Sequence, residues 1–392
     1  MNARLSKRGD VDPFYAMELL KLANRKRQSG MKVVSLCLGQ PADGAPAAVR
    51  EAAVAALRSG SPLGYTDADG LPALRAAICA HYASDYGVAV DPAKVLVTTG
   101  SSAAFTAIIL AAFDAGDAVA MARPGYPAYR NVLGALGCQV IDLDCGPQTR
   151  FQPTIEMLDA LPSAPAGLIV ASPSNPTGTI IEPKLLAAIA EWCAERGTLL
   201  ISDEIYHGIS FGRPTASVLQ HSPYHVAVGS FSKYYCMTGW RVGWLVVPDS
   251  LTRRVELLLG NLNLSTPTLS QLAAIAAFSP QAAAELDAHV AKYRENRDLV
   301  LRRLPEIGIH GTLLPEGAFY VYPDVSALTD DSLAWCLRAL DEIGVVLTPG
   351  IDFAPLRPGL VSPTDGTRFV RISTAGSAEE INEAFDRLKN WV

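Results

Sequence analysis

Runs of consecutive apolar and β-branched residues recur between residues 95 and 247, with helical segments between several of them. Such continuous runs indicate strands that are covered on both faces, because a strand with one wet face would alternate apolar and polar residues. The pattern therefore predicts an α/β fold whose large domain has a mostly parallel seven-stranded sheet sandwiched by helices. The predicted strands span residues 95–99, 118–122, 140–143, 168–171, 199–202, 226–230 and 242–247.

Three helices are predicted between these strands, because each begins with a recognisable start signal. Ser101 opens an apolar segment that reaches residue 113, and the Gly-Tyr-Pro sequence at 125–127 opens a helix that reaches residue 136. Glu182-Pro183 opens a third helix that reaches residue 196. Proline suits these positions because its fixed φ is helical and the first turn needs no N–H donor from it.

The two ends of the chain are predicted to form a smaller α+β domain. After Pro280 the pattern gives a long helix at 281–304, a second helix at 332–342, and strand segments at 317–322, 345–347 and 369–373. The opening residues carry one helix, 13–29, and a short strand, 33–38, which complete that domain from the other end. We therefore expect an N-terminal arm and small-domain segment over 1–45, a large domain over 46–285 and a small domain over 286–392.

Composition and charge exclude several classes of partner. The chain has 392 residues, a net charge of -6 and no long run of like charge, so neither nucleic acid nor a membrane surface is expected as a partner. The longest apolar stretch, 103–113, is too short to cross a bilayer, and no secretory signal is found at the N-terminus. The seven cysteines form no C-x-x-C pair, which favours reduced thiols and a cytoplasmic protein. The six histidines show no metal-binding spacing.

Polar side chains follow successive predicted strands at the points where the strands end. Asn175 follows strand 168–171, and Asp203 follows strand 199–202. Ser230 is the last residue of strand 226–230, and Lys233 follows that strand. The ligand crevice of a parallel sheet lies outside the carboxyl ends of its strands, so these residues should converge.

The residue types at this edge suggest a phosphorylated aldehyde as ligand. A desolvated Lys233 forms imines with aldehydes, and Ser230, Ser232 and Arg241 are natural phosphate donors, so pyridoxal 5'-phosphate is indicated. Asp203 would lie by its ring nitrogen, because only a protonated pyridine is a strong electron sink. Asn175 and Tyr206 would donate to its phenolate oxygen, and the helix start at Gly100-Ser101-Ser102 would supply amides to its phosphate.

Each of these residues also has a plainer interpretation. Ser230 and Lys233 match the S-x-x-K signature of serine acyl-transfer sites, although the companion S-D-N and K-T-G motifs are missing. Gly100-Ser101-Ser102 is also an ordinary helix start, and Asn175 lies in a sequence typical of a turn. Asp203 could be a solvated strand end, Tyr126 a core residue and Arg371 half of a surface ion pair. The joint occurrence of these residues, each at a strand end, favours the cofactor site.

Taken together, six motifs resemble those of the class I/II aminotransferases, a family of fold-type I pyridoxal phosphate enzymes, and the resemblance covers nearly the whole chain. The motifs are S-P-S-N-P-T-G at 172–178, S-D-E-I-Y at 202–206, S-F-S-K at 230–233, G-W-R-V-G-W at 239–244, G-A-F-Y at 317–320 and R-I-S at 371–373. The resemblance implies a transaminase that works by a ping-pong Schiff-base mechanism, in which an amino acid and a 2-oxo acid react in turn.

The resemblance also implies a role for each matching residue. Lys233 corresponds to the Schiff-base lysine and general base, Asp203 to the pyridine-nitrogen partner, and Asn175 with Tyr206 to the phenolate donors. The other roles concern the phosphate, the ring and the substrate. The phosphate ligands are matched by Ser230, Ser232 and Arg241, with the backbone amides of Ser101 and Ser102. Tyr126 matches the aromatic residue that stacks on the ring. Arg371 and Gly39 match residues at the site of the substrate carboxylate. Tyr65 matches a tyrosine lent to the neighbouring subunit's phosphate, which implies a homodimer with shared active sites.

The substrate is less sharply defined by the sequence. An acidic donor such as aspartate needs a further cation, but the loop 260–267 contains none, and Ser102 stands where some aspartate-active relatives carry a lysine. Phe14, Tyr15 and Met17 are candidates for an apolar lid, so a neutral amino donor is predicted. Arg123 and Arg254 are cations whose placement the sequence leaves open. The alternatives are an aspartate-specific transaminase and a β-lyase or decarboxylase on the same fold.

Overall fold

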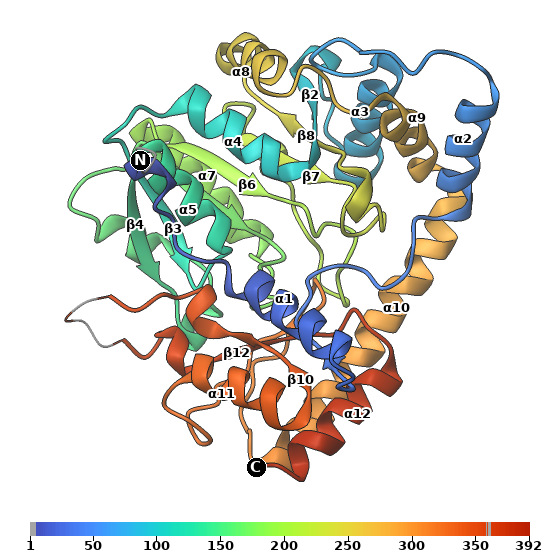
Figure 1. The fold of residues 1–392 in the computed structure, drawn as a ribbon. Coiled ribbons are helices and arrows are strands. Elements are labelled where there is room, and N and C mark those ends of the chain that lie inside the picture. The colour runs from blue at the N-terminus through green and yellow to red at the C-terminus, as the bar shows by residue number, and fades with distance from the viewer. Residues whose placement is uncertain (1–4, 358, 360–361) are drawn as a thin grey trace.

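The computed structural model describes residues 5–357, 359 and 362–392 and has an upper, larger domain and a lower, smaller one (Figure 1). The larger domain is built on a seven-stranded sheet of order β2-β8-β7-β6-β5-β3-β4, in which β8 alone runs antiparallel to its neighbours. All seven predicted strands are confirmed, with ends that shift by at most one residue. They are β2 (Val95–Thr98), β3 (Ala118–Arg123), β4 (Gln139–Asp144), β5 (Gly167–Ala171), β6 (Leu199–Asp203), β7 (Val226–Ser230) and β8 (Gly243–Val246).

Helices cover both faces of this sheet, as the continuous apolar strands require. One face packs on α4 (Gly100–Ala112), α5 (Pro127–Leu136) and α8 (Asp249–Leu262). The opposite face packs on α2 (Ala47–Arg58), α3 (Pro72–Tyr86), α7 (Pro183–Arg196), α9 (Thr268–Ile275) and the short α6 (Ile155–Asp159). The predicted helices at 101–113, 126–136 and 183–196 are confirmed, whereas α2, α3, α6, α8 and α9 were not among the predicted elements.

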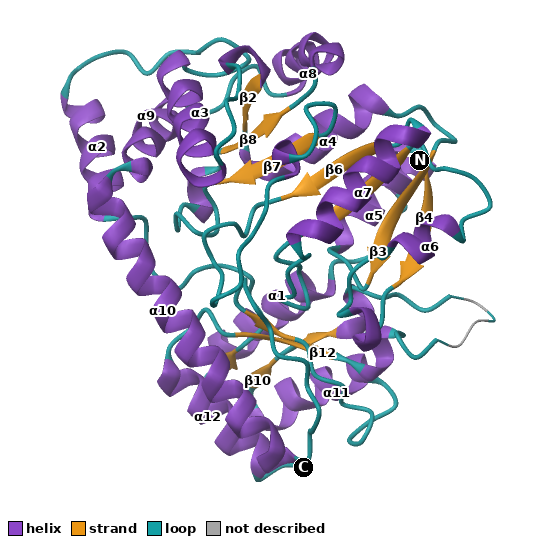
Figure 2. Cartoon of the chain, turned by 180° about the vertical axis from the view of Figure 1, so that it is seen from behind, coloured by secondary structure: helices purple, strands orange, loops and turns teal. Residues whose placement is uncertain are grey.

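The smaller domain combines both ends of the chain, as predicted. The N-terminal α1 (Tyr15–Gln28) and β1 (Val34–Ser35) join β10 (Val345–Val346), which pairs with β1 in parallel. A second, antiparallel sheet has the order β11-β12-β9, built from β11 (Thr348–Pro349), β12 (Val370–Ser373) and β9 (Tyr320–Val321). The helices α11 (Ser332–Arg338) and α12 (Ala378–Lys389) complete the domain, which Figure 2 shows from behind.

Several predicted elements of the smaller domain are longer than the observed ones. Of the segment 317–322, only Tyr320–Val321 form a strand. The strand predicted at 33–38 is limited to Val34–Ser35, because β10 offers only two residues for pairing. The helix predicted at 332–342 leaves the α conformation after Arg338 and ends in a π-helical turn, Ala339–Ile343.

One helix, α10 (Pro280–Arg303), runs from the larger domain into the smaller one along the edge of the molecule (Figure 1). Its residues Ala282 and Leu286 belong to the core of the large domain, and Val300 belongs to the core of the small domain. The predicted boundary at 285/286 therefore lies inside a continuous helix, and the division into 1–45, 46–285 and 286–392 stays a prediction. Across the described ranges, no helix has both the length and the apolar character needed to cross a membrane.

Candidate active site

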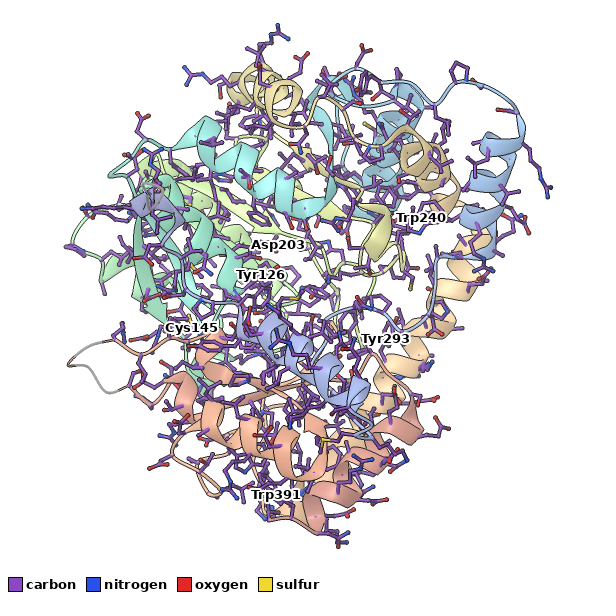
Figure 3. The ribbon with its side chains drawn as sticks, in the orientation of Figure 1. Tyr126, Cys145, Asp203, Trp240, Tyr293 and Trp391 are labelled. Carbon is purple, nitrogen blue, oxygen red and sulfur yellow. The ribbon has the colours of Figure 1, made fainter. Side chains whose placement is uncertain are left out.

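A cavity of about 300 Å³ lies at the carboxyl ends of β5, β6 and β7, between the sheet and the smaller domain. This is the volume of a small cofactor pocket. Asp203 and Tyr126 both line this cavity, and Figure 3 labels them near the centre of the molecule. The predicted residues that line the cavity come from both domains: Gly39, Ser101, Ser102, Tyr126, Asn175, Asp203, Tyr206, Ser232, Lys233, Arg241 and Arg371.

Lys233 lies in the loop after β7 and points into this cavity. Its Nζ donates a hydrogen bond to the carbonyl oxygen of Gly39 at 2.6 Å and lies 5.7 Å from the centroid of the Tyr206 ring. Burial lowers the pKa of Lys233 to about 8, and the positive charge of Arg371 acts in the same direction. About a tenth of the lysine is therefore a neutral amine at pH 7, far more than for an ordinary lysine, and the neutral form is the one that nucleophilic and base chemistry requires.

Asp203 is the last residue of β6 and is buried at the floor of the cavity. Its Oδ2 accepts a hydrogen bond from the hydroxyl of Tyr129, and its Oδ1 accepts one from the backbone N–H of Ile205 at 3.2 Å. Burial raises the pKa of Asp203 to about 6, while the bond from Tyr129 opposes that rise. The carboxyl group is therefore mostly ionised at neutral pH and able to pair with a protonated ring nitrogen.

Two tyrosine hydroxyls meet beside the lysine. The hydroxyls of Tyr206 and Tyr320 lie 2.7 Å apart and share a hydrogen bond. A Cβ atom at Gly39 would overlap the Tyr320 hydroxyl, so only glycine lets the 38–40 loop approach this pair so closely.

Arg371 lies on β12 and is almost completely buried, with 2% of its surface exposed. Its Nη1 donates to Oδ1 of Asn175 at 2.9 Å, and its Nη2 donates to the carbonyl oxygen of Cys37 at 2.6 Å. The guanidinium carbon lies 4.4 Å from the centroid of the Tyr320 ring. Nε has no hydrogen-bond partner among the described residues. A rigid guanidinium with spare donor capacity suits a carboxylate ligand.

The far end of the cavity has the donors that a phosphate needs. The N-terminus of α4 presents Ser101 and Ser102, and a positive end of this kind favours anions. Arg241 is held beside it by a hydrogen bond from Nη1 to the carbonyl oxygen of Thr238 at 3.0 Å. Gly100, with φ of 72°, leaves room for the Arg241 guanidinium, which a Cβ atom at this position would overlap.

The arrangement as a whole fits pyridoxal phosphate. A cationic cradle with a helix N-terminus lies at one end, a buried carboxylate lies on the floor, and an amine with a lowered pKa lies between them. The cradle depends on the glycine at position 100, because any larger residue would occupy the space of the arginine head group.

Three predicted cofactor residues do not line the cavity in this chain. One is Gly100, which lies beside the Arg241 guanidinium, and the others are Ser230 and Tyr65. The Ser230 hydroxyl instead accepts a hydrogen bond from the backbone N–H of Ser232 at 3.1 Å, within the loop that follows β7. Tyr65 is 83% exposed on the surface of the large domain. Its predicted role concerns a neighbouring subunit and stays a prediction.

The two arginines whose placement the sequence left open also lie elsewhere. Arg123 is buried in an ion cluster, in which its Nη1 lies 2.9 Å from a carboxylate oxygen of Asp144 and its Nη2 pairs with Asp365. Arg254 is exposed on α8. Neither lines the cavity, so neither provides a charge for a substrate side chain there.

The remaining wall of the cavity is mostly apolar, although Gln40, Thr106 and Thr238 also line it. Phe14 and Met17 at the start of α1 lie on one side, and Phe105 and Val132 lie on α4 and α5. Tyr15, the third residue predicted for the lid, does not line the cavity.

Sequence reasoning missed Tyr129 and Tyr320 as site residues. Tyr129 follows Tyr126 by three positions, and both line the cavity, so the helical spacing was an available signal. Tyr320 belongs to the G-A-F-Y motif, and no role had been assigned to that motif's tyrosine.

Comparison with known proteins agrees with this geometry. Residues 31–388 match the family "Aminotransferase class I and II". The chain is 51% identical to a valine–pyruvate aminotransferase of Mycobacterium tuberculosis, with 100% of this chain and 99% of the relative covered. It is 31% identical to an aspartate/prephenate aminotransferase of Thermus thermophilus, over 92% of this chain and 91% of that one.

Solved structures are similar over the full length. A crystal structure of an aminotransferase from Mycobacterium tuberculosis matches with a TM-score of 0.95 and 50% identity, covering 100% of this chain and 99% of that one. Aspartate aminotransferase from Thermus thermophilus with maleate matches with a TM-score of 0.92 and 30% identity, covering 100% of each chain. The chain belongs to the aminotransferase class I and II family and is a transaminase. Enzymes of this family use pyridoxal phosphate.

Proposed function

We propose that this enzyme uses pyridoxal 5'-phosphate, held on Lys233, to move the amino group of a neutral L-amino acid to a 2-oxo acid. The observation that carries the choice of donor is the set of cations on the cavity wall. Among the described residues that line the cavity, the cations are Lys233, Arg241 and Arg371. The cofactor takes the first two, and the substrate's α-carboxylate takes the third.

An acidic side chain would therefore lie against a mostly apolar wall whose described residues offer no further cation. Burying a carboxylate without a partner costs several kcal/mol, so aspartate would be a poor donor. Phe14, Met17, Phe105 and Val132 offer contacts that favour an aliphatic or aromatic side chain instead. The 51% identical relative, named for valine and pyruvate, supports this choice, whereas the relatives named for aspartate are about 30% identical.

Pyridoxal phosphate, when bound, supplies an aldehyde that forms imines with amines and a ring that accepts electrons from a carbanion. The protein's own groups do the rest. Arg371 pairs with the donor's carboxylate and thereby holds Cα beside Nζ of Lys233. The neutral amine of Lys233 accepts the proton from Cα, and the Asp203 carboxylate keeps a proton on the ring nitrogen. The hydroxyl of Tyr206 and the amide of Asn175 donate to the ring's phenolate oxygen, and Ser101, Ser102, Ser232 and Arg241 bind the phosphate.

We further propose that the enzyme is a cytoplasmic homodimer. The exposed ring of Tyr65, with Leu262 and Leu264 exposed in the 260–267 loop, is surface that a second copy would cover. All seven cysteines are free thiols, which favours a reducing compartment.

A steady-state comparison of donors tests the proposed substrate class. Alanine, valine, leucine, phenylalanine and aspartate are each assayed with pyruvate and with 2-oxoglutarate. We expect at least one neutral donor to exceed aspartate in kcat/KM by more than about tenfold, which is about 1.4 kcal/mol in the transition state. A preference for aspartate of the same size over every neutral donor would refute the proposal. Elimination or decarboxylation products in place of the 2-oxo acid would favour the alternative chemistry.

A further inference from the structure

Helix α1 carries the apolar lid of the cavity, yet its own sequence gives it no N-terminal cap. The N-cap position is Phe14, which makes no side-chain capping hydrogen bond. The first backbone N–H groups of a helix have no partner inside the helix and need an acceptor from elsewhere. The residues that start this helix, Phe14 and Met17, line the substrate cavity.

The missing cap comes from the other end of the chain. The carboxylate of Asp352 accepts the backbone N–H of Tyr15 at 2.9 Å through Oδ1 and that of Ala16 at 3.1 Å through Oδ2. Asp352 is 5% exposed, and its negative charge lies at the positive end of the helix dipole. This contact joins positions more than 330 residues apart and fixes where the lid helix begins.

The turn that carries Asp352 also contacts the substrate site. Asp352 ends the short turn Gly350–Asp352, whose first N–H is held by the carbonyl oxygen of Phe369 at 2.7 Å. The ring of the next residue, Phe353, lies 4.9 Å from the guanidinium of Arg371, and its carbonyl oxygen accepts the N–H of Gly125 at 3.0 Å. One rigid turn therefore links the carboxylate-binding arginine, the loop before Tyr126 and the lid.

From this geometry we infer that Asp352 is a positioning residue that determines donor specificity by holding Phe14 and Met17 over the substrate side chain. The inference rests on the proposed function, because it concerns a neutral side chain that the lid touches. A branched side chain reaches the lid, whereas the methyl group of alanine is too short to gain from it. Loss of the cap should therefore weaken catalysis with valine more than catalysis with alanine.

The test compares kcat/KM for valine and alanine in the holoenzyme and in two variants of Asp352. In Asp352→Ala the valine-to-alanine ratio should fall about tenfold, since both charge-assisted bonds are lost. Asp352→Asn keeps one oxygen acceptor, so the valine-to-alanine ratio should fall less in this variant. It also provides a test if the alanine variant folds poorly. Asp331→Ala is the matched control, because Asp331 caps α11 through the N–H groups of Leu333 and Ala334 at 2.9 and 3.0 Å, and α11 does not line the cavity.

Hydrogen exchange provides a second readout that needs no turnover. Peptides that cover residues 13–28 should exchange faster in Asp352→Ala than in the wild type or in Asp331→Ala. A ratio that stays within about twofold of the wild type, or unchanged exchange in this segment, would overturn the inference. An enzyme that accepts no neutral amino donor would instead refute the proposed function, and the exchange result alone would then decide whether Asp352 holds the lid.

Discussion

Nζ of Lys233 lies 2.6 Å from the carbonyl oxygen of Gly39 and donates a hydrogen bond to it, although the two residues are 194 positions apart in the chain. This bond brings the N-terminal segment of the smaller domain against the amine of the larger one. The amine of Lys233 is therefore positioned by both domains.

The close approach at Gly39 gives a prediction about Tyr320. A Cβ atom in Gly39→Ala would collide with the Tyr320 hydroxyl and disturb its bond to Tyr206, so kcat/KM should fall about tenfold, as expected for overpacking of about 1 to 3 kcal/mol. Tyr320→Phe removes the colliding oxygen and should restore part of that loss in the double variant. Measuring kcat/KM for the wild type, the two single variants and the double variant completes a double-mutant cycle. Strictly additive losses would show that the two residues do not interact.

The pKa of Lys233 predicts how the apoenzyme takes up its cofactor. Only the neutral amine attacks an aldehyde, so the rate of covalent attachment should rise about tenfold per pH unit at low pH and level off above the lysine's pKa of about 8. Arg371→Ala removes a positive charge that lowers this pKa, so the plateau should begin at higher pH. The rates are followed by cofactor absorbance after mixing. A rate that keeps rising to the ordinary lysine value of 10.5 would contradict the lowered pKa.

Tyr129 is predicted to act through Asp203. The hydroxyl of Tyr129 stabilises the ionised carboxylate, so in Tyr129→Phe the pKa of Asp203 should rise further above about 6. Because the ionised form is then lost at higher pH, the acid limb of the kcat profile should move upward, with kcat at neutral pH reduced about tenfold, as expected for a bond to a charged group. Cofactor affinity should change little, since the phosphate contacts remain. In an Asp203→Asn background the limb should not respond to Tyr129→Phe, and a response there would assign the effect to another group.

Subunit mixing tests the prediction for Tyr65. If its hydroxyl reaches the neighbouring subunit's phosphate, Tyr65→Ala and Lys233→Ala chains should each be impaired alone but regain activity when mixed, because one of the two composite sites in a hybrid dimer is intact. Activity is measured after labelled chains have demonstrably exchanged. No recovery would mean that Tyr65 serves its own chain or has no part in catalysis.

The fold could be predicted largely from the sequence because β5, β6 and β7 are buried on both faces and read as unbroken apolar runs. Helix α8 was not predicted, although its buried residues Val255 and Leu259 have the four-residue spacing of one helix face. That Lys233, Asp203 and Arg371 line one cavity was predictable, because strand ends meet at one edge of a sheet and because their motifs are distinctive. The N-terminal cap that Asp352 provides for α1 could not be predicted, since nothing local to either segment indicates a contact across more than 330 residues.

The most direct test of the account is a single half-reaction with the loaded enzyme and no oxo acid. We predict that valine or another neutral amino acid yields one 2-oxo acid per Lys233 site, that aspartate at the same concentration reacts far more slowly, and that Lys233→Ala yields none within the same time. Mass spectrometry after borohydride reduction should locate the cofactor on Lys233 in the wild type. Attachment to a different lysine, or full product formation by Lys233→Ala, would contradict the assignment of this cavity as the active site.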